Sequence, residues 1–368
     1  MTLAPIGGDG RARARDSWTP KNYDGGRSGI LTLRRALENS KNLVTARLLD
    51  GGIETDPEQS LRRVCELALE AQLYIECVPH YPFVLGAQPV RILDLAAFYA
   101  AIANEGAMPT PYAFETVDEG GRSVYRRRVS APVPIGSADR AAFYQLRTML
   151  QGVLARGTAR SLRALAPYVA GKTGTSDNEN DAWFVGFTND VTVAVWVGYD
   201  NADGRRRTLG RGQTGAKVAI PIFRDIVEAA WAHHAPKAEL GPPSPQAAKQ
   251  LIALPIDLNS GDRLTSQDGK GFTEYFRLNW FGQLRETQQH SPVEAQPALP
   301  PRAVDHQRER GRPADELNEP QEIVMGGRVV IRAANLQTRD PGGLGSARQR
   351  HHLAPIGVLD ARHDRDTP

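Results

Sequence analysis

Two apolar segments joined by a short polar turn constrain the fold of this chain most strongly. Residues 182–187 have the aromatic and β-branched content of a buried strand. After turn residues at 188–190, valines recur at every second position from Val191 to Val197. This alternation is the period of a half-buried strand. The two segments therefore predict an antiparallel hairpin.

A third strand is expected just before this hairpin, from Tyr168 into the motif Lys172-Thr173-Gly174-Thr175. A polar loop at residues 176–181 follows it. A cation, two hydroxyls and free backbone amides at one strand are suited to bind an anionic peptide end. The tetrapeptide alone would be an ordinary strand end or turn, because a motif match needs structural context.

A Ser-x-Asn triplet, Ser40-Lys41-Asn42, lies far upstream in the sequence. Leu33, Ala36, Leu37 and Ser40 recur at helical spacing, so the triplet is predicted near the end of an amphipathic helix or just past it. On its own the triplet would be an ordinary polar helix end. Together with the lysine motif it indicates acyl transfer by an active-site serine.

Further helices make the expected fold class α/β, an antiparallel sheet flanked by helices. Each has apolar residues three and four positions apart. They are predicted at Pro57 to Leu73, Val90 to Ala103, Asp139 to Ala155 and Ile220 to Ala232. Gly120-Gly121 and the prolines at 132–134 bound a short hairpin-like insertion.

These motifs together resemble the transpeptidase domain of class A, bifunctional penicillin-binding proteins. That family carries Ser-x-x-Lys, Ser-x-Asn and Lys-Thr-Gly motifs. The likeness covers residues 17–235 and continues more weakly to about residue 288. Besides the two motifs, the segments within this range that are similar to the family are 18–24, 157–159, 183–186, 196–200, 214–216 and 221–224. The resemblance implies the fold of penicillin-binding proteins and serine β-lactamases, N-terminally incomplete in this chain.

The resemblance implies catalytic roles for Ser40, Asn42 and Lys172. Ser40 would relay a proton towards the leaving amine, and Asn42 would orient the substrate amide. Lys172 would attract the substrate carboxylate and help Ser40 to release its proton. In the family, a serine attacks the D-Ala-D-Ala amide of a peptidoglycan stem peptide, and β-lactams mimic that amide.

The same resemblance implies that Thr173, Gly174 and Thr175 form the substrate-binding strand. The two threonine hydroxyls would bind the carboxylate, and the amide of Thr175 would form half of an oxyanion hole. The implied partners are stem peptides ending in D-Ala-D-Ala and β-lactams. No cofactor is expected. No metal is expected either, because no Cys/His grouping has metal-ligand spacing.

The family's nucleophile motif is missing from this sequence. No serine is followed by lysine three positions later, and the lysine after Ser17, Lys21, lies one position too far. We therefore expect a fragment that keeps the pocket wall but does not turn over. Two alternatives stay open. One is a non-catalytic module that captures stem peptides through Lys172, and the other is a β-lactamase-type serine hydrolase that uses Ser17 or Ser176.

The ends of the chain are expected to be irregular. Residues 1–16 are predicted to be a disordered start. Residues 236–368 are predicted to be a mostly flexible tail rich in Pro, Gln and Arg, with a possible small hairpin at 322–332. Cys65 lies on the apolar side of a helix and Cys77 in a loop, a pattern that favours two buried thiols over a disulfide.

Charge and hydropathy restrict the partners and the location. A formal net charge of +3 gives no reason to expect nucleic acid. No stretch approaches the roughly 20 apolar residues that span a bilayer. The family works in the periplasm behind an inner-membrane anchor, so a periplasmic location is expected by resemblance, although no signal or anchor is evident in this chain.

Overall fold

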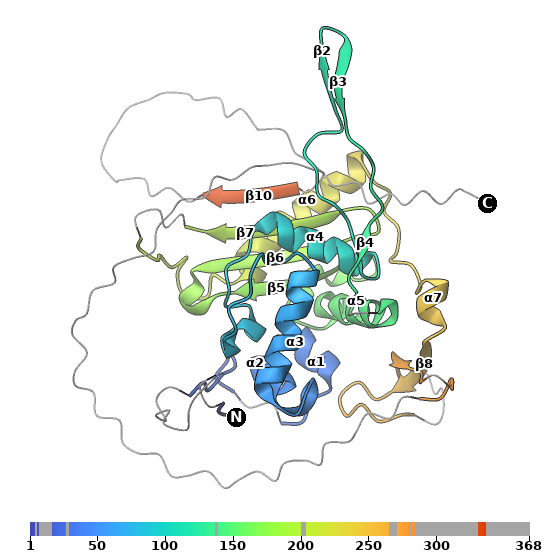
Figure 1. Cartoon of the computed structure of the whole chain (residues 1–368). Helices are drawn as coiled ribbons and strands as arrows, with labels where there is room; N and C mark the ends of the chain where they lie inside the picture. Colours follow the sequence, from blue (N-terminus) through green and yellow to red (C-terminus); the bar gives the residue numbers. More distant parts are fainter. Residues whose placement is uncertain are drawn as a thin grey trace.

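The central element of the fold is a four-stranded sheet with the order β10-β7-β6-β5 (Figure 1). A computed structural model describes residues 1–3, 6, 17–26, 29–136, 139–199, 204–264, 271–279, 281–284 and the strand at 330–335. The sheet strands are β5 (Ala170–Thr175), β6 (Asp181–Phe187), β7 (Thr192–Gly198) and β10 (Val330–Asn335). β5, β6 and β7 are antiparallel neighbours, and β10 runs parallel to β7.

The register of the sheet confirms the predicted hairpin and the strand before it. Trp183 lies opposite Trp196 across β6 and β7. Between these strands, the Thr188 amide donates to the Val191 carbonyl at 2.8 Å, and the Thr188 hydroxyl accepts from the Val191 amide at 3.0 Å. Lys172 lies opposite Val185, so the lysine motif occupies the strand at the edge of the described sheet.

Helices cover both faces of this sheet, as expected for the α/β class. In Figure 1, α4 (Ile92–Ala103) lies in front of the sheet and α6 (Ile220–His233) behind it. α4 packs on Val185 and Ala194, and Phe223 of α6 contacts Phe184 with 4.5 Å between ring centroids. α5 (Arg140–Ala155) packs beside β5. Burial of these apolar side chains supplies the main stabilisation of the domain.

A second, smaller core lies among the N-terminal segments. The N-terminal helices are α1 (Leu33–Glu38), α2 (Asn42–Arg47) and α3 (Pro57–Glu70). α3 contributes to the second core, whereas α1 packs on α5 and places Leu37 against the main core. Leu49, Leu61, Tyr81 and the buried Leu3 belong to the second core. Leu3 also pairs with Trp18 in an antiparallel bridge. The predicted disordered start is therefore wrong at Leu3, because this side chain fills the second core; residues 4, 5 and 7–16 lie outside the described part.

The two cysteines form a disulfide, so the prediction of two buried thiols is wrong. Cys65 lies on α3 and Cys77 in the loop that follows, with 5.6 Å between their Cα atoms. Gln72 adopts a left-handed φ of 52° just after α3. This turn reverses the chain and returns Cys77 to the helix, a reversal that the residue spacing alone does not reveal.

The tail predicted to be flexible is folded in its first part. It contains α7 (Pro245–Ala248) and an antiparallel hairpin of β8 (Leu251–Ile256) and β9 (Phe272–Arg277). Ala247 and Leu251 are buried against Ala141 and Tyr144 of α5. The prediction fails here because this segment needs few apolar residues of its own when it packs on an existing helix. The predicted hairpin at 322–332 lies largely outside the described residues.

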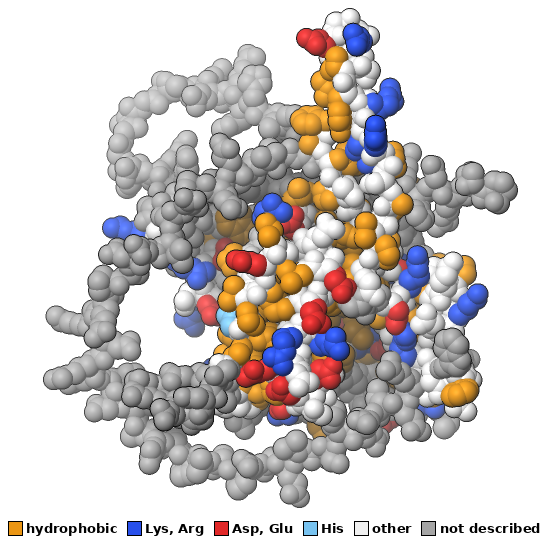
Figure 2. Space-filling view, viewed as in Figure 1, with side chains coloured by type: hydrophobic (Ala, Val, Ile, Leu, Met, Phe, Trp, Pro, Cys, Tyr) orange, Lys and Arg blue, Asp and Glu red, His pale blue; other side chains and the backbone are white. Residues whose placement is uncertain are grey.

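The predicted insertion is a hairpin that projects from the body of the domain (Figure 1). It consists of β2 (Thr116–Glu119) and β3 (Arg122–Arg126), joined at Gly120-Gly121. The short pair β1 (Ala107–Met108) and β4 (Val133–Pro134) forms its base. Hydrophobic and basic side chains lie along the hairpin in Figure 2. No described helix has the length and apolar character needed to cross a membrane.

Candidate active site at strand β5

The chain reverses at Ser40, directly after α1. The Ser40 amide donates to the Leu37 carbonyl at 3.1 Å, and the Lys41 amide donates to the Ala36 carbonyl at 2.9 Å. This pair of bonds is a Schellman motif, in which the reversing residue is usually glycine. Ser40 takes that position with a φ of 53°. A serine in this left-handed conformation is strained, and such strain is concentrated at functional sites.

The reversal brings Ser40 to Lys172. The Nζ of Lys172 donates a hydrogen bond to Ser40 Oγ at 2.8 Å, although the two residues are 132 positions apart. A second bond from Nζ reaches the Thr173 carbonyl at 3.0 Å. The structure therefore brings together two of the residues that the motifs singled out.

Burial changes the acidity of this lysine. The residue as a whole is half-buried. Protein atoms nevertheless surround its ammonium group closely, and desolvation lowers the pKa of Lys172 to about 8. A lysine with such a pKa is still mainly charged at neutral pH, but it gives up its proton far more readily than an exposed lysine. It can attract an anion and also exchange a proton with Ser40.

The two threonine hydroxyls of the motif hold β5 to its surroundings. Thr173 Oγ1 lies 2.7 Å from Thr158 Oγ1, which follows α5. Thr175 Oγ1 accepts a hydrogen bond from the Gly215 amide at 3.1 Å. A hydroxyl can both donate and accept, so these contacts leave capacity for a ligand. Because β5 is an edge strand, alternate backbone groups also point away from the sheet.

Small residues allow the close packing behind β5. A Cβ on Gly174 would come within 3.1 Å of Trp183 Cβ. A Cβ on Gly215 would lie 2.1 Å from the Trp183 carbonyl oxygen and 2.4 Å from that of Gly174. The segment at 215–219 therefore approaches the β5–β6 pair as closely as only glycine permits.

Asn42 has a different set of contacts from the other motif residues. Its Nδ2 donates to the Lys21 carbonyl at 3.0 Å. The Asn22 side chain accepts from the Leu43 amide at 3.1 Å, and Lys41 pairs with Asp24 at 2.6 Å. These bonds fasten residues 21–24 to the chain after Ser40. The bond of Asn42 thus runs to the backbone, and its predicted role in orienting a substrate stays a prediction.

A contact that the motifs did not indicate joins this segment to the loop after β5. Tyr23 donates from its hydroxyl to Glu179 Oε1 at 2.7 Å, which raises the pKa of Tyr23. The same carboxylate oxygen accepts from the Gly212 amide at 3.3 Å. Asn178 and Glu179 have positive φ values of 58° and 50°. No spacing rule links residues 23 and 179, so only the fold reveals this contact.

Comparison with known proteins identifies the family of the central part of the chain. A sequence model of the penicillin binding protein transpeptidase domain matches residues 89–228, which include the lysine motif. These residues belong to the penicillin-binding protein transpeptidase family. Penicillin-binding protein 1A of Rickettsia bellii is 32% identical over 286 residues, which are 72% of this chain and 33% of the relative. The Aquifex aeolicus protein of the same name is 35% identical over 214 residues, 58% of this chain and 27% of that protein.

The transpeptidase fold extends beyond the matched residues. Penicillin-binding protein 1A from Haemophilus influenzae is similar with a TM-score of 0.59 at 21% identity, over 78% of this chain and 44% of that chain. PonA1 from Mycobacterium tuberculosis gives a TM-score of 0.50 at 20% identity, over 67% of this chain and 68% of that one. These likenesses show the fold. The chain spans about a third of the length of the Rickettsia bellii relative.

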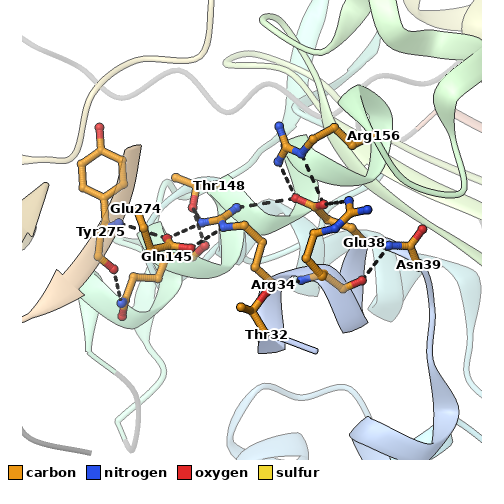
Figure 3. A network of polar contacts seen from close by, with 10 residues as sticks. Thr32, Arg34, Glu38, Asn39, Gln145, Thr148, Arg156, Glu274 and Tyr275 are labelled. Carbon is orange, nitrogen blue, oxygen red and sulfur yellow. Dashed lines mark hydrogen bonds and ion pairs between the residues drawn. The ribbon is translucent and has the colours of Figure 1, made fainter. Parts of the chain in front are cut away.

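The transpeptidase domain fixes the end of α1 through buried charges (Figure 3). Glu38 is fully buried and accepts from Arg35 Nη1 at 2.9 Å and from Arg156 Nε at 3.3 Å. Its backbone carbonyl accepts from the Thr158 amide at 3.0 Å. Glu38 lies two positions before Ser40, so this network determines where Ser40 sits. Buried charges on an amphipathic helix carry no sequence signal that separates them from exposed ones.

Ser176, an alternative nucleophile, has a structural role in the transpeptidase domain. Its hydroxyl donates to Asp181 Oδ2 at 2.7 Å and accepts from the Asp181 amide at 2.9 Å. These two bonds close the loop between β5 and β6. Within the described ranges, no group of three or more His, Cys, Asp or Glu residues is placed to hold a metal ion.

Proposed function

We propose that this chain forms the carboxylate-binding side of a D,D-transpeptidase site that serves peptide cross-linking of peptidoglycan. The hydrogen bond between Lys172 and Ser40 carries the proposal, because it joins the two family motifs at one point. The penicillin-binding protein 1A relatives are cell-wall synthesis enzymes that act outside the cytoplasm, and proteins with this domain bind β-lactams and stem peptides.

The chemistry of the site suits the terminal carboxylate of a D-Ala-D-Ala peptide or of a β-lactam. Lys172 supplies a positive charge in a desolvated place, where its attraction for an anion is stronger than in water. Thr173 and Thr175 add hydroxyls on the same edge strand. Ser40 connects the lysine to the position where a leaving amine would take up a proton.

We propose that binding occurs without acylation of this chain. No serine in the sequence has a lysine three positions later. The binding step and the acylation step can therefore be tested separately.

Calorimetry with an N-acylated D-Ala-D-Ala peptide tests the binding step. We expect Lys172→Ala to weaken binding about 30-fold, the effect of losing a charge-assisted bond worth about 2 kcal/mol. Lys249→Ala is the matched control, because Lys249 is exposed beside α7. No binding, or equal affinity in Lys172→Ala, would contradict the proposed site. A covalent adduct with a fluorescent penicillin would contradict the absence of acylation.

A serine hydrolase of the β-lactamase type is the second candidate. The bonds between Ser176 and Asp181 disfavour Ser176 as its nucleophile. Ser17 precedes Trp18, which stacks on Tyr81 at 6.0 Å in the second core. Hydrolysis of a chromogenic cephalosporin that is lost in Ser17→Ala would favour this candidate over the transpeptidase site.

We propose a periplasmic location. The relatives act outside the cytoplasm, and the Cys65–Cys77 disulfide suits an oxidising compartment. Cell fractionation followed by thiol labelling tests this proposal. Recovery of the chain in the cytoplasm with both thiols reduced would contradict it.

A further inference from the structure

A buried ion pair joins α1 to the C-terminal hairpin (Figure 3). Arg34 is 2% exposed and donates from Nε and Nη2 to the two carboxylate oxygens of Glu274, each at 2.5 Å. The two residues are 240 positions apart. Nη2 also donates to Thr148 Oγ1 of α5 at 2.9 Å. One guanidinium thus connects α1, α5 and β9, and its two parallel bonds to the carboxylate define their relative orientation.

An aromatic ring of the same hairpin lies against two guanidinium groups. The Phe272 ring centroid is 4.9 Å from Cζ of Arg34 and 4.7 Å from Cζ of Arg156. Both distances are within the range of cation–π attraction. The same two arginines flank Glu38. Arg34 Nη1 lies 4.0 Å from Glu38 Oε1, and Arg156 donates hydrogen bonds to both carboxylate oxygens of Glu38. β9 therefore contacts two of the three arginines that surround Glu38, the last residue of α1.

Close packing on α5 also restricts the end of α1. A Cβ on Gly152 would lie 1.9 Å from Glu38 Oε1, so α5 and Glu38 are in close contact. Ser40 follows two positions later and meets Lys172 through a single hydrogen bond of 2.8 Å. A small movement of α1 would therefore separate Ser40 from Lys172. Such a bond is lost when its heavy atoms move beyond about 3.5 Å.

We propose that Glu274 and Phe272 are positioning residues, which hold the end of α1 so that Ser40 Oγ stays within reach of Lys172 Nζ. The β8–β9 hairpin is then part of the site, although it lies outside the residues that match the transpeptidase domain. This inference deepens the proposed function, because that function rests on the same pair. It concerns the geometry of the unliganded chain, so it can be tested without any ligand.

The side-chain nitrogen signal of Lys172 in NMR reports on this geometry. The signal is identified by its loss in Lys172→Met, and its titration midpoint in the unmodified chain is expected at the pKa of about 8. Among the described residues, the groups bonded to Nζ are the Ser40 hydroxyl and the Thr173 carbonyl, both uncharged, and desolvation is the cause of the lowered pKa. We expect Glu274→Gln to raise the midpoint by about one unit as water reaches the ammonium.

Arg277→Gln is the matched control. Arg277 anchors the same hairpin to Asp139 at the start of α5 and to Gln250 before β8, at contacts remote in sequence from α1. We expect this variant to keep the original midpoint. An equal rise in Arg277→Gln, or an unchanged midpoint in Glu274→Gln, would overturn the inference.

Phe272→Leu tests the positioning role of the hairpin if Glu274→Gln fails to fold, which circular dichroism would reveal. Leucine keeps an apolar side chain between the two arginines but removes the aromatic face. We expect a smaller rise of the Lys172 midpoint in the same direction, and no rise would overturn the inference. If the midpoints shift as expected but no peptide binds to the unmodified chain, the proposed function fails and the positioning role stands.

Discussion

The carbonyl oxygen of Glu38 accepts a hydrogen bond from the amide of Thr158 at 3.0 Å. This bond places the last residue of α1 on the turn that follows α5. Thr158 in turn contacts Thr173 of β5 through their hydroxyls at 2.7 Å. A short chain of contacts therefore leads from the helix that precedes Ser40 to the strand that carries Lys172. Several variants test how much the site depends on it.

Gly157→Ala should destabilise the domain strongly. An added Cβ would lie 2.0 Å from the Glu38 carbonyl oxygen and 2.9 Å from Val153 Cα, and both are backbone atoms that cannot rotate away. We expect the free energy of unfolding to fall by about 3 kcal/mol, the upper part of the usual range for overpacking. Urea denaturation measures the loss. Gly241→Ala is the control, because a Cβ there meets no atom within 4 Å; equal effects in both variants would contradict the close contact at Gly157.

Ser40→Gly should be more stable than Ser40→Ala. Both changes remove the hydroxyl that Lys172 contacts, so this loss cancels in the comparison. They differ in backbone strain, because residue 40 has a φ of 53° and only glycine adopts that value freely. We expect a difference of about 1 kcal/mol in the free energy of unfolding by urea denaturation. Equal stability would show that the reversal at residue 40 carries no strain.

Lys172 should make the free energy of unfolding depend on pH in the alkaline range. The folded chain releases the proton of Lys172 near pH 8, whereas the unfolded chain holds it to about pH 10.5. Between these values the unfolded state binds more protons, so the free energy of unfolding should rise with pH. The contribution of this group reaches at most about 3 kcal/mol.

Lys172→Met isolates this contribution, because it removes one titrating group and leaves the others in place. We expect the difference in stability between the two proteins to change across pH 8 to 10.5 and to be constant below that window. Thermal or urea unfolding at a series of pH values provides the measurement. A difference that is the same at every pH would show that the Lys172 ammonium is as well solvated in the folded chain as in the unfolded one.

Reduction of the disulfide should destabilise the second core. The bond between Cys65 and Cys77 closes a loop with a sequence separation of 12 residues. A cross-link of this span stabilises by about 3 kcal/mol, chiefly through the unfolded chain. We expect a lower melting temperature in the presence of a reductant, measured by calorimetry. A chain with both cysteines changed to alanine should not respond to the reductant, and free thiols detected in the untreated native protein would contradict the bond.

Local sequence patterns predicted the elements that position the site. The alternation of valines in β7 and the polar turn at residues 188–190 determine the hairpin, because strand period and turn chemistry are local properties. The helical spacing before Ser40 likewise predicted a helix that ends just ahead of it, as observed. The meeting of Ser40 and Lys172 followed from the family resemblance, since their separation of 132 positions has no local signal.

Long-range contacts account for the features that sequence reasoning missed. The ion pair of Arg34 with Glu274 places two charged residues in the interior, where composition alone would not place them. Cys77 returns to Cys65 because of a reversal at Gln72, a residue type that seldom adopts a positive φ. The β8–β9 hairpin is ordered by packing on α5. Its own low apolar content therefore wrongly predicted a flexible segment.

The β2–β3 hairpin has a practical consequence for handling the protein. All of its strand residues are exposed, and Arg122 and Arg126 lie on it. Trypsin should therefore cut there before it reaches the core. The two pieces would stay associated, because α4 from the first piece and α5 from the second enclose the same sheet. A nicked preparation would run as two bands on a denaturing gel while still presenting an intact Ser40–Lys172 pair.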